Sequence, residues 1–151
     1  MAVPGKSYLK EGYAIFLIAG KEYGINLNIL SSIIDPLRSY SSSDSFNISS
    51  ESIKFEDREI PLIDIYSILK TKPPPQSKET RLIIVTKEGQ ETAAFFVERV
   101  KEFISFDFKN STCLDYSDDP GQEYLKWQLI YEDRYILIPD FDKILTEIIP
   151  N

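Results

Sequence analysis

Apolar residues follow one another in short runs along most of the chain, in the patterns that β-strands produce. Strands are predicted at residues 13–18, 53–55, 60–63, 81–86, 93–97, 101–106 and 124–131. Short polar turns separate several of these runs. The run Leu82–Val85 is apolar at every position, which is typical of a strand buried on both faces. The pattern therefore predicts a mainly β protein.

Three segments interrupt this regular pattern. Residues 23–34 begin as a strand, and the apolar spacing then predicts a helical turn ahead of Asp35 and Pro36. Residues 39–52 contain eight serines in fourteen positions, which predicts a loop. Residues 107–123 are polar and acidic, and they also predict a loop.

Two short helices are indicated, each preceded by an aspartate that can accept hydrogen bonds from the first turn. Asp64 precedes apolar residues that share one helix face, and the prolines at 73–75 follow as a stiff spacer. Asp140 precedes a second helix at 141–149, whose apolar residues recur at helical spacing. We therefore interpret both aspartates as N-caps.

The chain contains an internal repeat at an offset of 76 residues. Seven identities fall within fourteen positions without a gap. The matching residues are Glu56, Asp57, Arg58, Ile60, Asp64, Ile68 and Leu69 in the first copy, and Glu132, Asp133, Arg134, Ile136, Asp140, Ile144 and Leu145 in the second. The repeat predicts one unit used twice, consisting of a hairpin turn, a strand and a capped helix, and hence two similar lobes.

Composition narrows the classes of function. The 151 residues carry a net charge of −7 and include one cysteine and no histidine. Histidine-dependent catalytic triads and zinc sites are therefore excluded, and Cys113 has no internal disulfide partner. The acidic balance argues against nucleic acid and anionic membranes as partners. No membrane insertion, metal or cofactor is expected, and we expect a cytoplasmic protein.

Four segments carry a resemblance to a known family. They are Tyr23–Leu27 with Leu30 and Ile33, then Ile60–Ile65, then Val97–Val100, and finally Tyr135–Leu145. In their order and spacing they resemble the CheW-like family of adaptor proteins, which couple chemoreceptors to the histidine kinase CheA. The resemblance covers about residues 8–149.

The resemblance implies a fold and a role. The fold would be two intertwined five-stranded SH3-like β-barrel subdomains with short capped helices, within a single CheW-like domain at 1–151. The lobes would span 13–72 and 80–140, and 141–149 would form a C-terminal helix. The protein would be a scaffold without catalysis. Its partners would be the regulatory domain of a CheA-type histidine kinase and the cytoplasmic signalling tip of a chemoreceptor.

The resemblance also suggests which residues meet those partners. These are Leu30, Ser32 and Ile33, the turn residues Glu56, Asp57 and Arg58, and Val97, Arg99 and Val100. Family members usually carry an Asn-hydrophobic-Arg-Gly sequence before the proline-containing strand. Here Glu56 and Asp57 replace the arginine and the glycine. The change from basic to acidic reverses the sign of any ion pair at that position.

Two further classes of function stay open at this point. The chain may be read as a divergent interaction module that kept the fold and changed its partners, for instance by binding a basic surface. It may also be read as an enzyme that works through carboxylates alone, such as a glycosidase. The latter needs two carboxylates roughly 5–10 Å apart in one cleft. Capping by Asp64 and Asp140 does not suggest that arrangement.

Overall fold

The computed structural model describes residues 10–36, 46–48, 52–55, 57–109, 111–116 and 119–148. Within them the strands are β1 (Lys10–Ile18), β2 (Lys21–Asn26), β3 (Leu30–Ile34), β4 (Phe46–Ile48), β5 (Ser52–Phe55), β6 (Arg58–Pro61), β7 (Arg81–Lys87), β8 (Gln90–Val97), β9 (Arg99–Asp107), β10 (Thr112–Asp115), β11 (Leu125–Tyr131) and β12 (Arg134–Pro139). The helices are α2 (Ile65–Ile68) and α3 (Phe141–Ile148). The prediction of a mainly β protein is confirmed.

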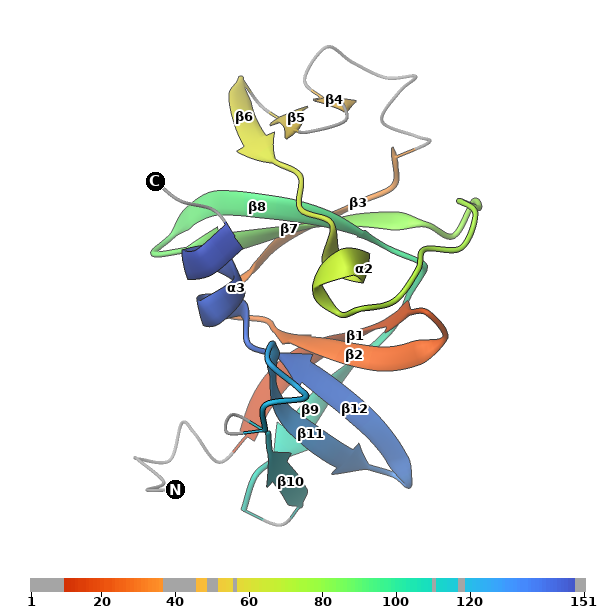
Figure 1. The fold of residues 1–151 in the computed structure, drawn as a ribbon, viewed down its shortest axis with the longest axis vertical. Coiled ribbons are helices and arrows are strands. Elements are labelled where there is room, and N and C mark those ends of the chain that lie inside the picture. Colours follow the sequence, from red (N-terminus) through yellow and green to blue (C-terminus); the bar gives the residue numbers. More distant parts are fainter. Residues whose placement is uncertain are drawn as a thin grey trace.

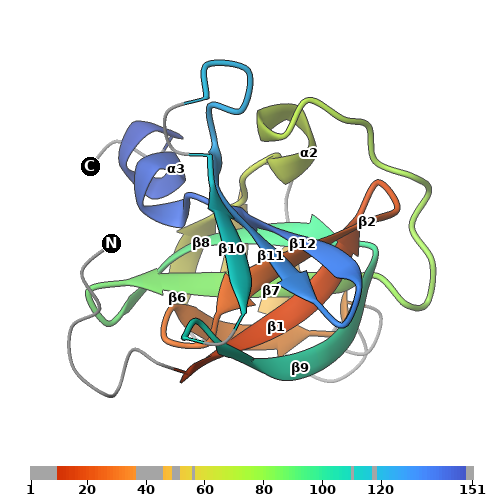
Figure 2. The ribbon, with the colours of Figure 1, turned by 90° about the horizontal axis from the view of Figure 1, so that it is seen from below.

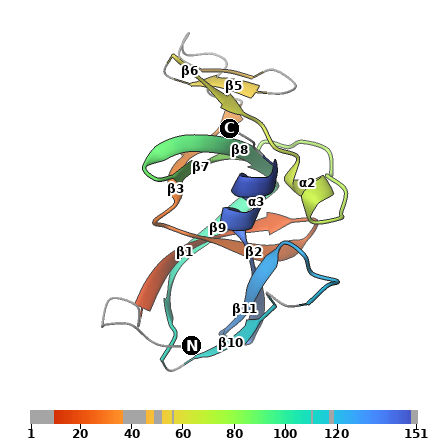
Figure 3. The same ribbon diagram turned by 60° about the vertical axis from the view of Figure 1, so that its left-hand side comes forward.

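The strands form three sheets that lie one above another (Figure 1). A six-stranded sheet has the order β10-β11-β12-β2-β1-β9, and two three-stranded sheets have the orders β3-β7-β8 and β4-β5-β6. Both helices lie on the same side of the molecule (Figures 2 and 3). No helix among the described residues is long and apolar enough to cross a membrane.

Three hydrophobic cores occupy the spaces that the sheets define. One core lies within the six-stranded sheet and includes Leu129 and Ile136. A second includes Ile53, Ile60 and Leu82 and joins the two three-stranded sheets. The largest core lies between these two and receives the buried faces of both helices. The sheets therefore act as walls between successive cores.

Strand β1 forms one of these walls because its side chains alternate between two faces. Ala14, Phe16 and Ile18 belong to the largest core, whereas Tyr13 and Ile15 belong to the core within the six-stranded sheet. Strand β7 is buried in the same way, as its continuous apolar run predicted. Leu82 and Ile84 face one core, and Ile83 and Val85 face another.

Strands from the two halves of the chain share one sheet. β1 pairs antiparallel with β2 and β9, and β12 pairs parallel with β2 at Leu137 and Tyr23. This exchange is consistent with the intertwining that the resemblance implies. The closed five-stranded barrels and the lobe boundaries at 13–72 and 80–140 remain predictions.

The internal repeat corresponds to two structurally similar units. Each unit is a two-stranded hairpin followed by a capped helix, β5-β6-α2 in the first copy and β11-β12-α3 in the second. Asp64 Oδ1 accepts a hydrogen bond from Ser67 N at 3.2 Å, and Asp140 Oδ1 accepts one from Lys143 N at 3.1 Å. The interpretation of both aspartates as N-caps is confirmed.

The helical turn predicted between residues 23 and 34 is wrong. The segment forms β2, a turn at 27–29 and β3. Asn26 Oδ1 accepts a hydrogen bond from Asn28 N at 2.8 Å and so closes the turn. A β-bulge between Leu30 and Ser32 shifts the alternation of β3, and this shift produces the spacing that resembles a helix face.

Two predicted loops also contain strands. β10 lies in the polar stretch 107–123 and pairs only with β11, so it is a short edge strand. Its side chains are exposed or half-buried, and therefore it lacks the apolar pattern that marks a strand in the sequence. β4 lies in the serine-rich stretch 39–52 and pairs with β5.

Gly24 allows β2 to pack closely in the core of the six-stranded sheet. A Cβ atom at this position would lie 2.9 Å from Ile138 Cδ1 and 3.2 Å from Ile15 Cδ1. We expect Gly24→Ala to lower the free energy of unfolding by about 1–3 kcal/mol, because the surrounding side chains must shift. Urea denaturation measures this change.

Gly121→Ala is the matched control, because its Cβ would meet Asp119 Oδ1 only at 3.4 Å, an ordinary contact. We expect the control to change the free energy of unfolding by less than about 0.5 kcal/mol. Equal stability of the Gly24 variant and the native protein would contradict this description of the core.

Candidate functional site

Strand β3 carries three of the predicted binding residues. Leu30, Ser32 and Ile33 are all half-buried, and β3 pairs only with β7. Its other edge has no strand partner among the described residues. An open strand edge presents backbone groups to which another chain can pair. This edge is therefore a plausible contact region for another protein.

The tip of the β5-β6 hairpin carries two more of the predicted residues. Asp57 and Arg58 are exposed, whereas Glu56 lies outside the described residues. The φ angle of Asp57 is 64°, in the left-handed region that favours glycine and that aspartate tolerates. This conformation fits the family glycine expected at that position.

Glu91 on β8 connects the β3 edge to the hairpin tip. One carboxylate oxygen forms an ion pair with the Arg58 guanidinium, and the other accepts a hydrogen bond from Ser31 Oγ at 3.1 Å. Arg58 also donates to the backbone oxygen of Glu91 at 3.3 Å. We call Leu30–Ile33, Arg58 and Glu91 the β3–hairpin surface.

The electrostatic environment of Glu91 stabilises its charged form. A hydrogen bond within its own backbone unit, the Ser31 hydroxyl and the Arg58 charge all lower its pKa. Glu91 was not predicted, because in the sequence it stands among the polar residues of the β7-β8 turn. No spacing pattern distinguishes it from solvated turn residues.

The remaining predicted residues lie where β8 joins β9, and each has a different environment. Val97 is fully buried in the largest core and also lines the cavity described below. Arg99 is exposed and forms an ion pair with Glu79 at 4.0 Å. Val100 is half-buried and packs against the same core.

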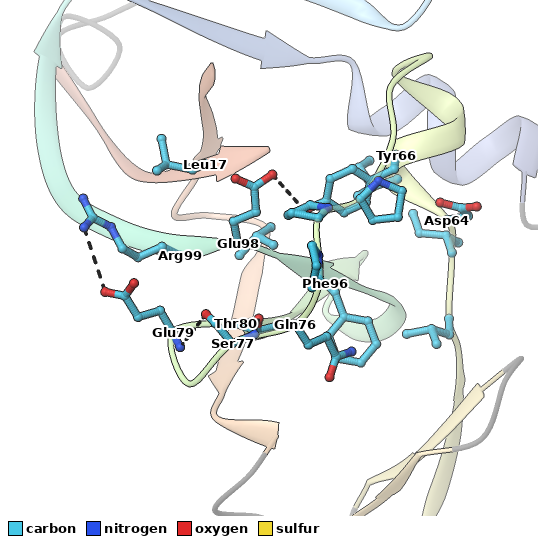
Figure 4. A pocket seen from close by; sticks show the side chains of 17 residues that line it. Leu17, Asp64, Tyr66, Gln76, Ser77, Glu79, Thr80, Phe96, Glu98 and Arg99 are labelled. Carbon is cyan, nitrogen blue, oxygen red and sulfur yellow. Dashed lines mark hydrogen bonds and ion pairs between the residues drawn. The ribbon is translucent and has the colours of Figure 1, made fainter. Parts of the chain in front are cut away.

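Glu98 fixes this junction and was not predicted as a site residue. Its carboxylate accepts hydrogen bonds from the backbone N–H groups of Ala19 and Gly20, the latter at 3.3 Å. The Tyr66 hydroxyl on α2 donates to it at 3.4 Å (Figure 4). Burial and the Glu98 charge raise the pKa of Tyr66. Glu98 therefore links three elements that are distant in the sequence.

A pocket of about 690 Å³ lies beside this junction (Figure 4). Its walls come from β8, α2 and the segment 73–80, and they include Leu62, Tyr66, Phe96 and Arg99. We call residues 71–80 the strap and this cavity the strap pocket. Among the described residues, no cluster of acidic or cysteine side chains suits a metal ion.

A second exposed feature lies on β9. A β-bulge at Lys101 places Val100 and Phe103 on the same face of the sheet. Their register partners on β1 are Phe16 and Ala14, respectively. The Phe103 side chain is 58% exposed. An aromatic side chain exposed to this extent offers apolar contact area to another protein.

Leu27 extends this apolar feature. It lies on the turn after β2 and is 40% exposed, and a Cβ atom on Gly12 would come within 2.7 Å of Leu27 Cδ1. Gly12 therefore leaves room for the leucine side chain to lie over β1. We call Leu27, Val100 and Phe103 the β9 apolar strip. Phe103 was missed because alternation along its strand predicts only an outward-facing side chain and does not distinguish a binding residue from an ordinary surface residue.

The comparisons with known proteins agree with this architecture. A family model described as the CheW-like domain matches residues 12–148. The crystal structure of the scaffolding protein TtCheW from Thermoanaerobacter tengcongensis superposes with a TM-score of 0.66 at 21% sequence identity. That alignment covers 85% of this chain and 88% of the other. A search of curated proteins gives no match.

Arg58→Ala tests the link at Glu91. We expect the variant to raise the pKa of Glu91 toward the usual glutamate value, because it removes a positive charge from the carboxylate. NMR titration of the Glu91 side-chain carboxyl carbon measures this pKa. Arg99→Ala is the control, because Arg99 pairs with Glu79 instead.

The same link makes a small contribution to stability that depends on pH. Because folding lowers the pKa of Glu91, this contribution is present above the usual glutamate pKa and is lost as pH falls through the lowered value. For an exposed ion pair it amounts to at most about 1 kcal/mol. An unchanged Glu91 pKa in Arg58→Ala would contradict the assigned contact.

Proposed function

Because the chain belongs to the family of CheW-like domains, we propose that it is a non-catalytic scaffold in chemotaxis signalling. In this role it holds a CheA-type histidine kinase and a chemoreceptor together in the cytoplasm, beside the receptor array. The observation that carries the proposal is the family match over residues 12–148. The exposed surfaces on β3 and β9 give the scaffold two separate places to bind.

We assign the β3–hairpin surface to the regulatory domain of the kinase. An open strand edge suits a partner that is itself a small β domain, since backbone groups can pair across the contact. Arg58 supplies an exposed positive charge at the hairpin tip, two residues after the acidic Glu56. Glu91 and Ser31 hold this arginine beside the β3 edge.

We assign the β9 apolar strip to the cytoplasmic signalling tip of the receptor. A helical partner needs a row of exposed apolar side chains against which its own apolar face can pack. Leu27 and Phe103 provide two exposed apolar side chains for this contact, and the half-buried Val100 lies on the same face of β9 as Phe103. The aromatic ring of Phe103 is the most exposed of the three and is the expected anchor.

One observation favours a second candidate function. Glu56 replaces the arginine that family members usually carry, and the chain has a net charge of −7. A module with these charges suits a more basic partner than the usual one. In this alternative the fold and the scaffold role persist, but the kinase or the receptor is replaced by another protein.

Phe103→Asp tests the receptor assignment. Isothermal titration of the full-length chain with a helical receptor-tip fragment gives the dissociation constant, which we expect the variant to raise at least tenfold. Binding should weaken because the carboxylate introduced by this substitution would be buried against the apolar face of the helix. Tyr135→Asp is the control, because Tyr135 is also an exposed aromatic residue, at 63%, but lies on β12. Equal losses in both variants would contradict the assignment.

Arg58→Asp tests the kinase assignment. We expect it to weaken binding of the kinase regulatory domain by about tenfold or more, while receptor-tip binding stays unchanged. Lys109→Asp, an equal charge change at an exposed residue after β9, should leave both affinities unchanged. If the folded native chain binds neither partner at concentrations up to 1 mM, the coupling function is wrong and the second candidate holds.

A further inference from the structure

We propose that the strap pocket binds a short, extended, positively charged segment of a partner protein, which pairs with the open edge of β8. This binding site is separate from the β3–hairpin surface and the β9 apolar strip. Neither Arg58 nor Phe103 lines the pocket. The proposal therefore does not depend on the kinase and receptor assignments.

The edge of β8 that faces away from β7 is only partly paired. Leu62 forms an isolated parallel bridge with Ala94, and Ile63 N donates to Ala94 O at 2.8 Å. The chain then leaves the edge at Asp64 and enters α2. The pairing of β8 with this segment consequently ends at Ala94, and the edge is next occupied at Glu98, whose N–H donates to Leu17 O at 3.0 Å.

Phe96 is the next residue of β8 whose backbone faces this edge. Hydrogen-bonding direction alternates along a strand, so the N–H and C=O groups of Phe96 point the same way as those of Ala94, away from β7. Among the described residues no hydrogen bond to these two groups occurs on that side. Phe96 lines the strap pocket, so this pair of groups is available to an incoming chain.

The strap on the opposite wall cannot occupy this edge. The prolines at 73–75 have no backbone N–H, so they cannot pair with β8 as a strand. Its last residues form a turn of their own, with Ser77 N donating to Thr80 Oγ1 at 2.9 Å and Thr80 N donating to Ser77 O at 3.2 Å. The space of about 690 Å³ between strap and β8 lies within the usual size range of ligand sites.

The charges around the pocket specify the class of segment. Asp64, Glu79 and Glu98 line it, and Arg99 is the one basic residue among its lining side chains (Figure 4). The excess of acidic groups favours lysine or arginine in the bound segment. Phe96, Leu62 and the prolines supply apolar surface for the intervening side chains. An extended peptide that alternates basic and apolar residues matches both features.

A defined peptide pair tests the proposal on the full-length chain. The probe is the end-blocked peptide lysine-valine-arginine-valine-lysine, and its comparison peptide replaces each basic residue with glutamate. We expect the basic probe to bind at least tenfold more tightly in NMR titrations. We also expect it to shift the amide signals of Phe96 and Glu98 and to slow hydrogen exchange of the Phe96 amide.

Two glutamine-to-tryptophan substitutions distinguish binding in the strap pocket from nonspecific electrostatic attraction between the basic probe and the acidic chain. Gln76 lines the pocket, is exposed and makes no contact that the fold requires, so Gln76→Trp should fill the cavity and weaken the basic probe at least tenfold. Gln90→Trp is the control, because Gln90 is exposed at the start of β8 and lies outside the pocket. Glu79→Lys should weaken the basic probe and strengthen the acidic one.

Three results would overturn the proposal. They are no binding of the basic probe at 1 mM, equal binding of the basic and acidic peptides, and unchanged binding to a correctly folded Gln76→Trp variant. We expect Gln76→Trp to keep the native affinity for the receptor-tip fragment and the kinase domain. Failure of the peptide site is thus distinguishable from failure of the scaffold function.

Discussion

Strand β1 has to be buried on both faces, and the rest of the architecture depends on this constraint. Its alternating side chains enter two different cores, with Phe16 in the largest core and Ile15 in the core of the six-stranded sheet. β7 meets the same requirement between the largest core and the third one. Two such strands force the sheets to lie in layers, and the elements that bury only one face are left at the outside.

The candidate binding surfaces lie on those outer elements. β3 and β9 are end strands of their sheets, and the hairpin β5-β6 belongs to the three-stranded sheet β4-β5-β6 at one end of the molecule (Figure 1). Acidic residues hold these outer elements to the layered cores. Glu91 binds Arg58, and Glu98 binds the β1-β2 turn together with Tyr66. The second repeat also carries a bridging arginine, since Arg134 on β12 pairs with Glu22 on β2 and with Glu102 on β9.

The sequence predicts the buried parts of this protein well, because burial imposes a pattern. The apolar runs of β7 and β8, the caps at Asp64 and Asp140 and the repeat could all be found without a structure. The outer elements are harder, since a single extra residue changes their pattern. The bulge after Leu30 made a strand resemble a helix. Alternation along β9 predicts that Phe103 faces outward, but it does not mark this residue as one that binds a partner. Glu91 and Glu98 act through contacts between distant segments, which no local pattern records.

In the proposed function, one chain holds a kinase domain and a receptor tip at the same time, on two different surfaces. The most direct measurement is light scattering after size-exclusion chromatography of the full-length chain mixed with both partners. The account predicts one complex that contains all three components in equal numbers. A mixture of two binary complexes, in which either partner displaces the other, would contradict it.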